Sequence, residues 1–223
     1  MKKLALALVA SAVSLSAANA NISTGFYLGA TAGYGATTSK ITGTDAANRA
    51  TTGSTDFGSN AANIGLIGGY GWVAGCMYYG GEIGYTFENT KVRSTAGADA
   101  TTGSTELKRN GYFNAALRGG YLFTPNTMFY VRLGMNWGKW TLNDSLNNDF
   151  TNARRATGSK NRMSFVPGVG LETAIHKNVY LRVEYNYEFG PSVRAKANNV
   201  ANAFTNVGSI RSQSAKIGLA YKF

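Results

Sequence analysis

The chain has 223 residues and a formal net charge of +11, and it contains 28 glycines, 13 tyrosines, 11 phenylalanines and 3 prolines. So many glycines argue against a helical fold, because each costs about 1 kcal/mol in a helix interior relative to alanine. One cysteine and one histidine exclude an intramolecular disulfide and a clustered metal site, so no cofactor is expected.

The first twenty residues have the pattern of a secretory signal peptide. Met1-Lys2-Lys3 is basic, residues 4–15 form an apolar run, and Ala18-Asn19-Ala20 is a small-x-small cleavage pattern. The apolar run is too short for a membrane-spanning helix of ~20 residues, and no later run approaches that length. We therefore predict a signal peptide over residues 1–20 and one mature domain over residues 21–223.

Alternation of apolar and polar residues predicts the strands of the mature domain. A period of two places one set of side chains on each face of a strand. Pro167 falls inside the sixth such segment and predicts a bulge there, because proline cannot donate to the strand ladder. Each segment has about the ~9–11 residues that a tilted strand needs to cross a membrane. The eight segments are residues 25–34, 63–72, 78–88, 112–123, 128–140, 163–173, 179–189 and 214–223.

The connections between these segments alternate in length. Short links cover residues 73–77, 124–127 and 174–178, whereas residues 35–62, 89–111, 141–162 and 190–213 are long and polar. Among strand structures, only a closed barrel leaves no unpaired edge in lipid. Short periplasmic turns and long extracellular loops are typical of outer-membrane barrels. We therefore predict an all-β fold, an eight-stranded, antiparallel, up-and-down transmembrane β-barrel.

The last strand ends in Leu219-x-Tyr221-x-Phe223, which resembles the C-terminal signature of bacterial outer-membrane barrels. With Ala18-x-Ala20, the eight strands and the four long loops, the chain resembles the small barrel superfamily of the OmpA membrane domain, OmpX-like proteins and opacity-type surface antigens. This resemblance implies a location in the bacterial outer membrane. It also implies assembly by the barrel-assembly machinery through Leu219, Tyr221 and Phe223. No periplasmic peptidoglycan-binding domain is expected.

The inward faces of the predicted strands carry charged residues that lipid would not tolerate. Buried charges persist only when they are paired, and an eight-stranded barrel is about wide enough for its side chains to fill. We therefore predict a neutralised ion-pair network that fills the lumen. A narrow porin-like channel for small solutes is the alternative, and the sequence leaves open whether the lumen conducts. The predicted network consists of Glu82, Arg118, Arg132, Glu172, Arg182, Glu184, Glu188 and Lys216.

The long loops carry much of the excess positive charge. Basic residues at the rim suit contact with lipopolysaccharide phosphates, outer-membrane lipid or an anionic host surface. A signal peptide and the absence of a compact Lys/Arg motif argue against nucleic acid as a partner. The candidate loop contacts are Arg93, Lys108, Arg109, Arg154, Arg155, Arg194 and Lys196.

These features predict a non-enzymatic surface protein that acts as an antigen, an adhesin or a host-contact surface. A monomer is expected, and the sequence leaves the oligomeric state open. The acyl-modifying enzymes and proteases among barrel families generally need a histidine beside Ser, Asp or Glu near the outer rim, whereas His176 lies in a predicted periplasmic turn. Cys76, near another short turn, is interpreted as a small hydrophobic residue, with any redox role left open. The ligand of the loops is also left open.

Overall fold

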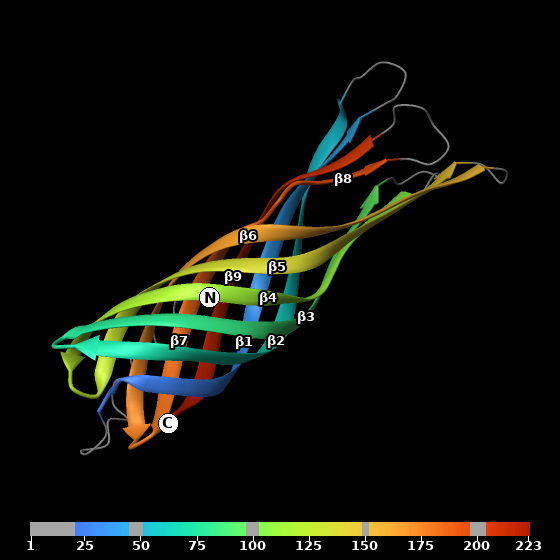
Figure 1. Ribbon diagram of the computed structural model, residues 1–223. Helices are drawn as coiled ribbons and strands as arrows, with labels where there is room; N and C mark the ends of the chain where they lie inside the picture. The colour runs from blue at the N-terminus through green and yellow to red at the C-terminus, as the bar shows by residue number, and fades with distance from the viewer. Residues whose placement is uncertain (1–20, 45–50, 97–102, 149–151, 197–203) are drawn as a thin grey trace.

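A computed structural model describes residues 21–44, 51–96, 103–148, 152–196 and 204–223. The predicted signal peptide therefore lies outside the described residues. No described helix is long and apolar enough to cross a membrane. The strands, shown in Figure 1, are β1 (Gly25–Thr44), β2 (Thr51–Ala74), β3 (Met77–Ala96), β4 (Gly103–Thr124), β5 (Thr127–Asn148), β6 (Asn152–His176), β7 (Val179–Phe189), β8 (Val193–Lys196) and β9 (Phe204–Lys222).

The strands form a closed barrel with up-and-down order. From β1 to β7, each strand pairs antiparallel with the next one in sequence, β7 pairs with β9, and β9 pairs with β1 to close the wall. Strand β8 pairs with β9 in the same register as β7, so β7 and β8 occupy one strand position in the barrel wall. We call each such position a stave. Within the described residues the nine strands thus make eight staves. The predicted eight-stranded fold is confirmed.

Alternation along each strand separates a lipid-facing surface from a filled interior. On β2, for example, the outward residues Ile64, Leu66 and Trp72 are each about 60% exposed, while the inward residues Asn63 and Ile67 are buried. Exposed apolar side chains are the normal state of a wall that faces lipid, since the hydrocarbon covers them. The lipid-facing residues of the other strands follow the predicted alternation as well.

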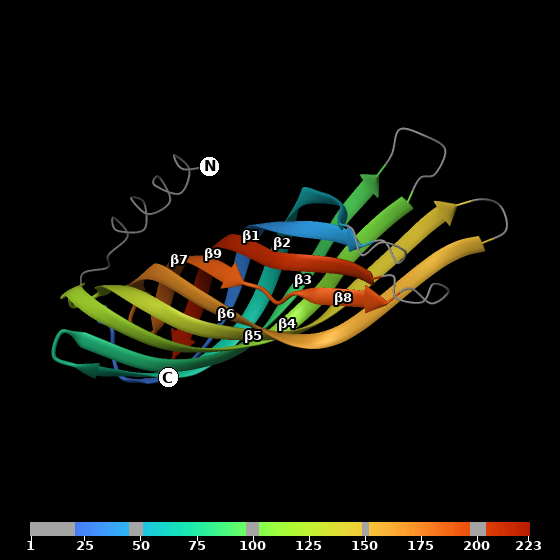
Figure 2. The same ribbon diagram turned by 90° about the horizontal axis from the view of Figure 1, so that it is seen from above.

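The two ends of the barrel differ, as Figures 1 and 2 show. At one end lie the C-terminus and tight turns at residues 75–76, 125–126 and 177–178. At the other end the strands continue as paired hairpins that project beyond the barrel. The prediction of long loops was therefore wrong over much of their length. Thr37, for example, still pairs with Ser59, and Thr141 with Ser159. Thr and Ser suit strands, so the backbone ladder continues where the apolar pattern stops.

The predicted bulge at Pro167 is absent. Strand β6 pairs with β5 without any shift, and Leu133 lies opposite Pro167. Toward β7, the pairing omits Val166 and Pro167 but keeps one register on both sides, from Phe165 opposite Phe189 to Gly168 opposite Asn186. The missing proline N–H therefore interrupts the ladder without inserting a residue.

The described chain begins by packing under the turn end of the barrel. Ile22 is buried against the core, and its N–H donates to the Pro125 carbonyl oxygen at 2.8 Å. The Tyr180 hydroxyl donates to the Asn21 carbonyl oxygen at 3.0 Å, and the Lys222 ammonium donates to the Ser23 carbonyl oxygen. These contacts cover the lumen at the turn end of the barrel.

Candidate functional site

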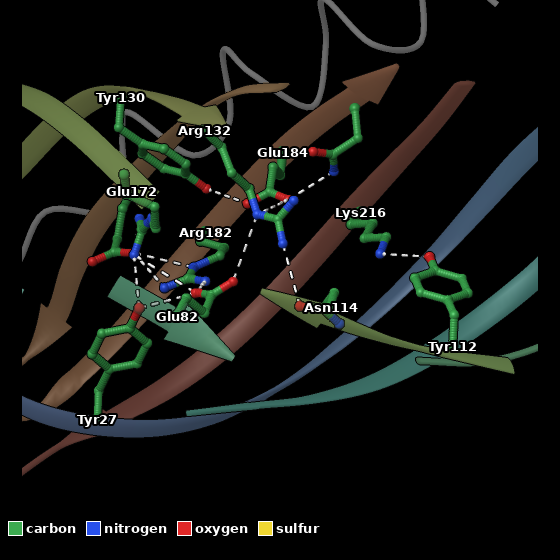
Figure 3. A network of polar contacts seen from close by, with 12 residues as sticks. Tyr27, Glu82, Tyr112, Asn114, Tyr130, Arg132, Glu172, Arg182, Glu184 and Lys216 are labelled. Atoms are coloured by element: carbon green, nitrogen blue, oxygen red, sulfur yellow. Dashed lines mark hydrogen bonds and ion pairs between the residues drawn. The ribbon is translucent and has the colours of Figure 1, made fainter. Parts of the chain in front are cut away.

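The lumen holds a cluster of three glutamates and three arginines, which we call the inner network; Figure 3 shows most of it from close by. Glu82 on β3 lies among all three arginines. Its Oε2 is 2.5 Å from Nη1 of Arg182 and 4.0 Å from Nη1 of Arg118, and its Oε1 is 3.7 Å from Nε of Arg132. All four side chains are less than one-tenth exposed.

Two further glutamates complete the inner network. Glu172 on β6 accepts from Arg118 at 2.7 Å and from Arg182 at 2.9 Å and 3.1 Å. Glu184 on β7 lies 3.8 Å from Arg132 and accepts from Asn186 at 2.7 Å. Three acids and three bases balance in charge, and each charge has an opposite neighbour. This pairing makes burial of such groups tolerable.

Inward tyrosines add a second set of partners to the inner network. The Tyr27 hydroxyl donates to Glu82 at 3.0 Å, and the Tyr130 hydroxyl donates to Glu184 at 2.8 Å. The Arg118 guanidinium lies 3.9 Å from the centre of the Tyr130 ring, within the range of a cation–π contact. These rings fit because glycine faces them: a Cβ on Gly170 would lie 2.5 Å from the Tyr130 hydroxyl oxygen. Alternation along β1 and β5 places Tyr27 and Tyr130 on the inward face, but it does not indicate which carboxylates they contact.

A second, smaller cluster lies nearer the hairpin end, and we call it the outer cluster. Arg109 on β4 is 2.6 Å from Glu188 on β7 and 3.0 Å from Glu88 on β3. Its guanidinium lies between the rings of Tyr112 and Trp140, at 4.4 Å and 4.5 Å from their centres. The cluster therefore joins three staves across the lumen.

Arg109 corrects the predicted set of loop contacts. It was predicted as an exposed rim residue, but it is 2% exposed and points inward. The cause is a shift of register in β4 between Arg109 and Tyr112, which appears in the pairing with both β3 and β5. A bulge reverses which alternate residues face the lumen. Glu88 continues the inward series of Glu82 and Thr86 on β3, so the alternation contained a signal for it.

The predicted lumen residues thus divide into three groups. Six form the inner network, Glu188 belongs to the outer cluster, and Lys216 lies apart on β9. Lys216 is partly exposed and donates to the Tyr112 hydroxyl at 3.4 Å, and among the described residues it has no ion pair.

A small polar cavity lies between the two clusters. Its volume is about 20 Å³, and Glu88, Arg109, Arg132, Asn186, Glu188 and Lys216 are among its lining residues. A space of this size holds about one water molecule. On either side of it the lumen is filled by ion pairs and aromatic rings.

The remaining predicted site residues lie outside the lumen. Leu219, Tyr221 and Phe223 face outward on β9 or at its end, each at least half exposed, and the Phe223 N–H donates to the Phe26 carbonyl oxygen at 2.9 Å. Lys108 is partly exposed. The side chains of Arg93, Arg154, Arg155, Arg194 and Lys196 lie outside what the structure describes.

The single histidine and the single cysteine of the chain both lie at tight turns. His176 ends β6 beside a tight turn, at the end of the barrel opposite the hairpins. Cys76, interpreted as a small hydrophobic residue, is exposed in the turn between β2 and β3. In the part of the chain that the structure covers, no group of three His, Cys, Asp or Glu side chains could hold a metal ion.

Comparison with known proteins gives one family. The family model described as outer membrane protein beta-barrel domain matches residues 5–223. A 22 kDa outer membrane protein of Rhizobium leguminosarum bv. viciae is 29% identical over 140 residues, which are 59% of this chain and 56% of that protein. The match therefore spans just over half the length of this relative.

Two solved structures share the fold. The outer membrane protease OmpT of Escherichia coli aligns with a TM-score of 0.57 at 9% identity, over 91% of this chain and 99% of that one. OprG of Pseudomonas aeruginosa aligns with a TM-score of 0.55 at 14% identity, over 91% and 98%. At these identities the likeness concerns the fold alone.

Proposed function

The chain belongs to the outer membrane protein β-barrel family and lies in the bacterial outer membrane, and on that premise we propose that it is a structural surface protein whose projecting hairpins make its contacts outside the cell. The observation that carries this proposal is the filled lumen. The inner network and the outer cluster fill the interior, and the cavity between them is only about 20 Å³. An interior of this kind suits a barrel that serves as a rigid anchor in the membrane. The function is therefore assigned to the hairpins.

A channel function has less support. Arg109 and its two glutamates join three staves near the hairpin end, and Ile22 and Lys222 cover the turn end. Wide aqueous pores need about sixteen strands, whereas eight leave an interior that side chains fill.

An enzymatic function also has less support. The likeness to the protease OmpT is one of fold, and its activity is a property of that protein. The single histidine of this chain, His176, is the last residue of β6 and lies beside the tight turn at residues 177–178, not on a hairpin. A His-based nucleophile or base at the hairpin end is therefore not available to this chain.

The filled lumen predicts an electrically silent barrel. Residues 21–223, refolded and inserted into a planar bilayer, should give no stable conductance steps. Replacing Arg132 by Ala should give at most rare, small steps, because Arg118 and Arg182 still occupy the centre. The exposed Arg211→Ala variant is the control for loss of one arginine. Stable openings of the unaltered protein that change with Arg132→Ala would instead establish a small channel.

The hairpins can be shortened at register positions that leave the barrel intact. The pairs Thr38–Gly58, Ser94–Thr105, Thr141–Ser159 and Phe189–Arg211 give the cut points. In each hairpin, all residues between the two members of the pair are replaced by Asn-Gly, which suits a two-residue hairpin turn. Bacteria that display the full chain should bind heparin-coated beads, chosen as an anionic polymer surface. Bacteria with the trimmed barrel should lose this binding.

Correct insertion of the trimmed barrel is checked by its resistance to protease added to isolated outer membranes. Binding that survives trimming in a correctly inserted barrel would assign the contact to the wall and contradict the proposal. Failure of the full chain to bind any anionic surface would remove the host-contact role.

A further inference from the structure

Three lysines lie together on the outer face of adjacent staves, just beyond the lipid-facing band. They are Lys91 on β3, Lys108 on β4 and Lys139 on β5, and we call them the lysine patch. Lys91 and Lys139 are exposed, and Lys108 is partly exposed. Their chain neighbours Thr90, Arg109 and Trp140 are at most 2% exposed and face the lumen, so alternation places the lysines on the outside.

Pairing brings these three positive charges close to one another. Lys91 lies directly opposite Lys108, and Lys108 lies opposite Thr141, two residues from Lys139. Directly opposed side chains have Cβ atoms about 5 Å apart, and like charges at that position destabilise a sheet. Among the described residues, no hydrogen bond or ion pair involves these three side chains. The acid nearest in sequence, Glu106, lies further along the hairpin, opposite Arg93. The patch therefore offers an uncompensated site for an anion.

Directly below the lysine patch, the same three staves carry aromatic rings. Phe87 on β3, Phe113 on β4 and Trp137 on β5 are 57–64% exposed. Phe113 also meets Tyr85 edge to face, with ring centres 4.7 Å apart. Exposed aromatic rings in a barrel mark the boundary between hydrocarbon and headgroups. The lysine patch therefore lies at the level of the headgroups of the outer leaflet.

Below the rings, the wall of the same staves is hollowed. The hollow has a volume of about 560 Å³, and its lining residues include Gly68, Gly81 and Ala115 together with Ile83, Leu117 and Leu133. Ala115 lies seven residues from Lys108 along β4, or roughly 23 Å at ~3.3 Å per residue. In a strand tilted by about 40° this distance corresponds roughly to the depth of one leaflet.

We propose that the outer face of β3, β4 and β5 is a docking surface for a phosphorylated glycolipid of the outer leaflet. The lysine patch binds the phosphates of the headgroup, and the hollow below the aromatic rings takes an acyl chain. All three levels include residues of β3, β4 and β5, which are adjacent strands of the barrel wall (Figure 1). Charge complementarity identifies the occupant, because neutral or cationic lipid would leave the Lys91–Lys108 repulsion in place.

The test uses the refolded chain of residues 21–223 in neutral detergent without divalent cations. The probes are lipid A with both phosphates and the same lipid A with its phosphates removed, and retained lipid is counted by native mass spectrometry. The variant carries Lys91→Gln, Lys108→Gln and Lys139→Gln. The control carries Lys177→Gln and Arg211→Gln, which remove two exposed positive charges from other parts of the barrel.

The unaltered protein and the control should retain phosphorylated lipid A, and the lysine-patch variant should bind it roughly 100-fold more weakly, since each basic residue near an anionic surface contributes about a factor of five. Equal loss in the control would overturn the proposal in favour of a general charge effect. Equal retention of dephosphorylated lipid A would overturn the role of the phosphates. Soluble heparin separates a lipid site on the lysine patch from the anion contacts proposed for the hairpins. If the lysine-patch variant loses heparin binding as strongly as lipid binding, the patch is a soluble-anion site and not a lipid site.

Discussion

Replacing Glu82 by Gln should lower the free energy of unfolding of the barrel by about 3–5 kcal/mol. Glu82 lies within 2.5–4.0 Å of three arginines at the centre of the lumen. A glutamine of the same shape keeps the packing but leaves the inner network with three positive charges and two negative ones. Removing one partner from a buried ion pair costs this much because the remaining charge has no compensation. The measurement is equilibrium unfolding in guanidinium of the refolded protein in micelles, followed by tryptophan fluorescence.

A double-mutant cycle shows whether the loss comes from charge imbalance. Arg132 lies no closer than 3.7 Å and 3.8 Å to its glutamates, whereas Arg118 and Arg182 approach a glutamate to 2.7 Å and 2.5 Å. Arg132→Gln should therefore cost less in the Glu82→Gln background than in the unaltered protein. Lys177→Gln, which removes an exposed charge in a tight turn, should change stability by less than about 0.5 kcal/mol. A Glu82→Gln protein within 1 kcal/mol of the unaltered one would mean that the lumen is hydrated and the ion pairs are weak.

The barrel could be predicted because the alternation of lipid-facing and lumen-facing residues is a local property of each strand. Alternation along one strand, such as the outward Val179, Leu181 and Val183 against the inward Tyr180 and Arg182, depends on the period of the backbone alone. The alternation of short and long connections then indicated the order of the strands around the barrel. The hairpin extensions were missed because beyond residue 35 the first strand continues with Thr and Ser, which form a ladder without an apolar face.

The site could be predicted only in part, because its partners are distant in sequence. Alternation identified Glu82, Arg132 and Arg182 as inward-facing, but it could not indicate that Arg182 meets Glu82 across 100 residues. That pairing depends on the closure and the stagger of the whole wall. Arg109 was misplaced for a local reason: strict alternation continued back from Tyr112 places Lys108 inside, and the bulge between them reverses this.

Arg109 and Lys108 therefore make a matched pair of neighbouring residues. Arg109→Met should lower the free energy of unfolding by about 3–5 kcal/mol, because Glu88 and Glu188 would be left buried without a counter-charge. Lys108→Met removes the same charge one residue away on the outer face. In lipid-free micelles it should change stability by less than about 0.5 kcal/mol. Guanidinium unfolding of both variants side by side gives the comparison.

The outer cluster also allows a rescue. Adding Glu88→Gln and Glu188→Gln to Arg109→Met removes the two unpaired carboxylates and should recover most of the lost stability, since amides are cheaper to bury than charges. Equal effects of Arg109→Met and Lys108→Met would contradict the bulge, because they would place both side chains in the same environment. A loss in Arg109→Met that the two amides do not recover would assign the role of Arg109 to its packing between Tyr112 and Trp140, at 4.4 Å and 4.5 Å from the ring centres. The rescue thus separates the contribution of charge pairing from that of cation–π packing at the hairpin end of the lumen.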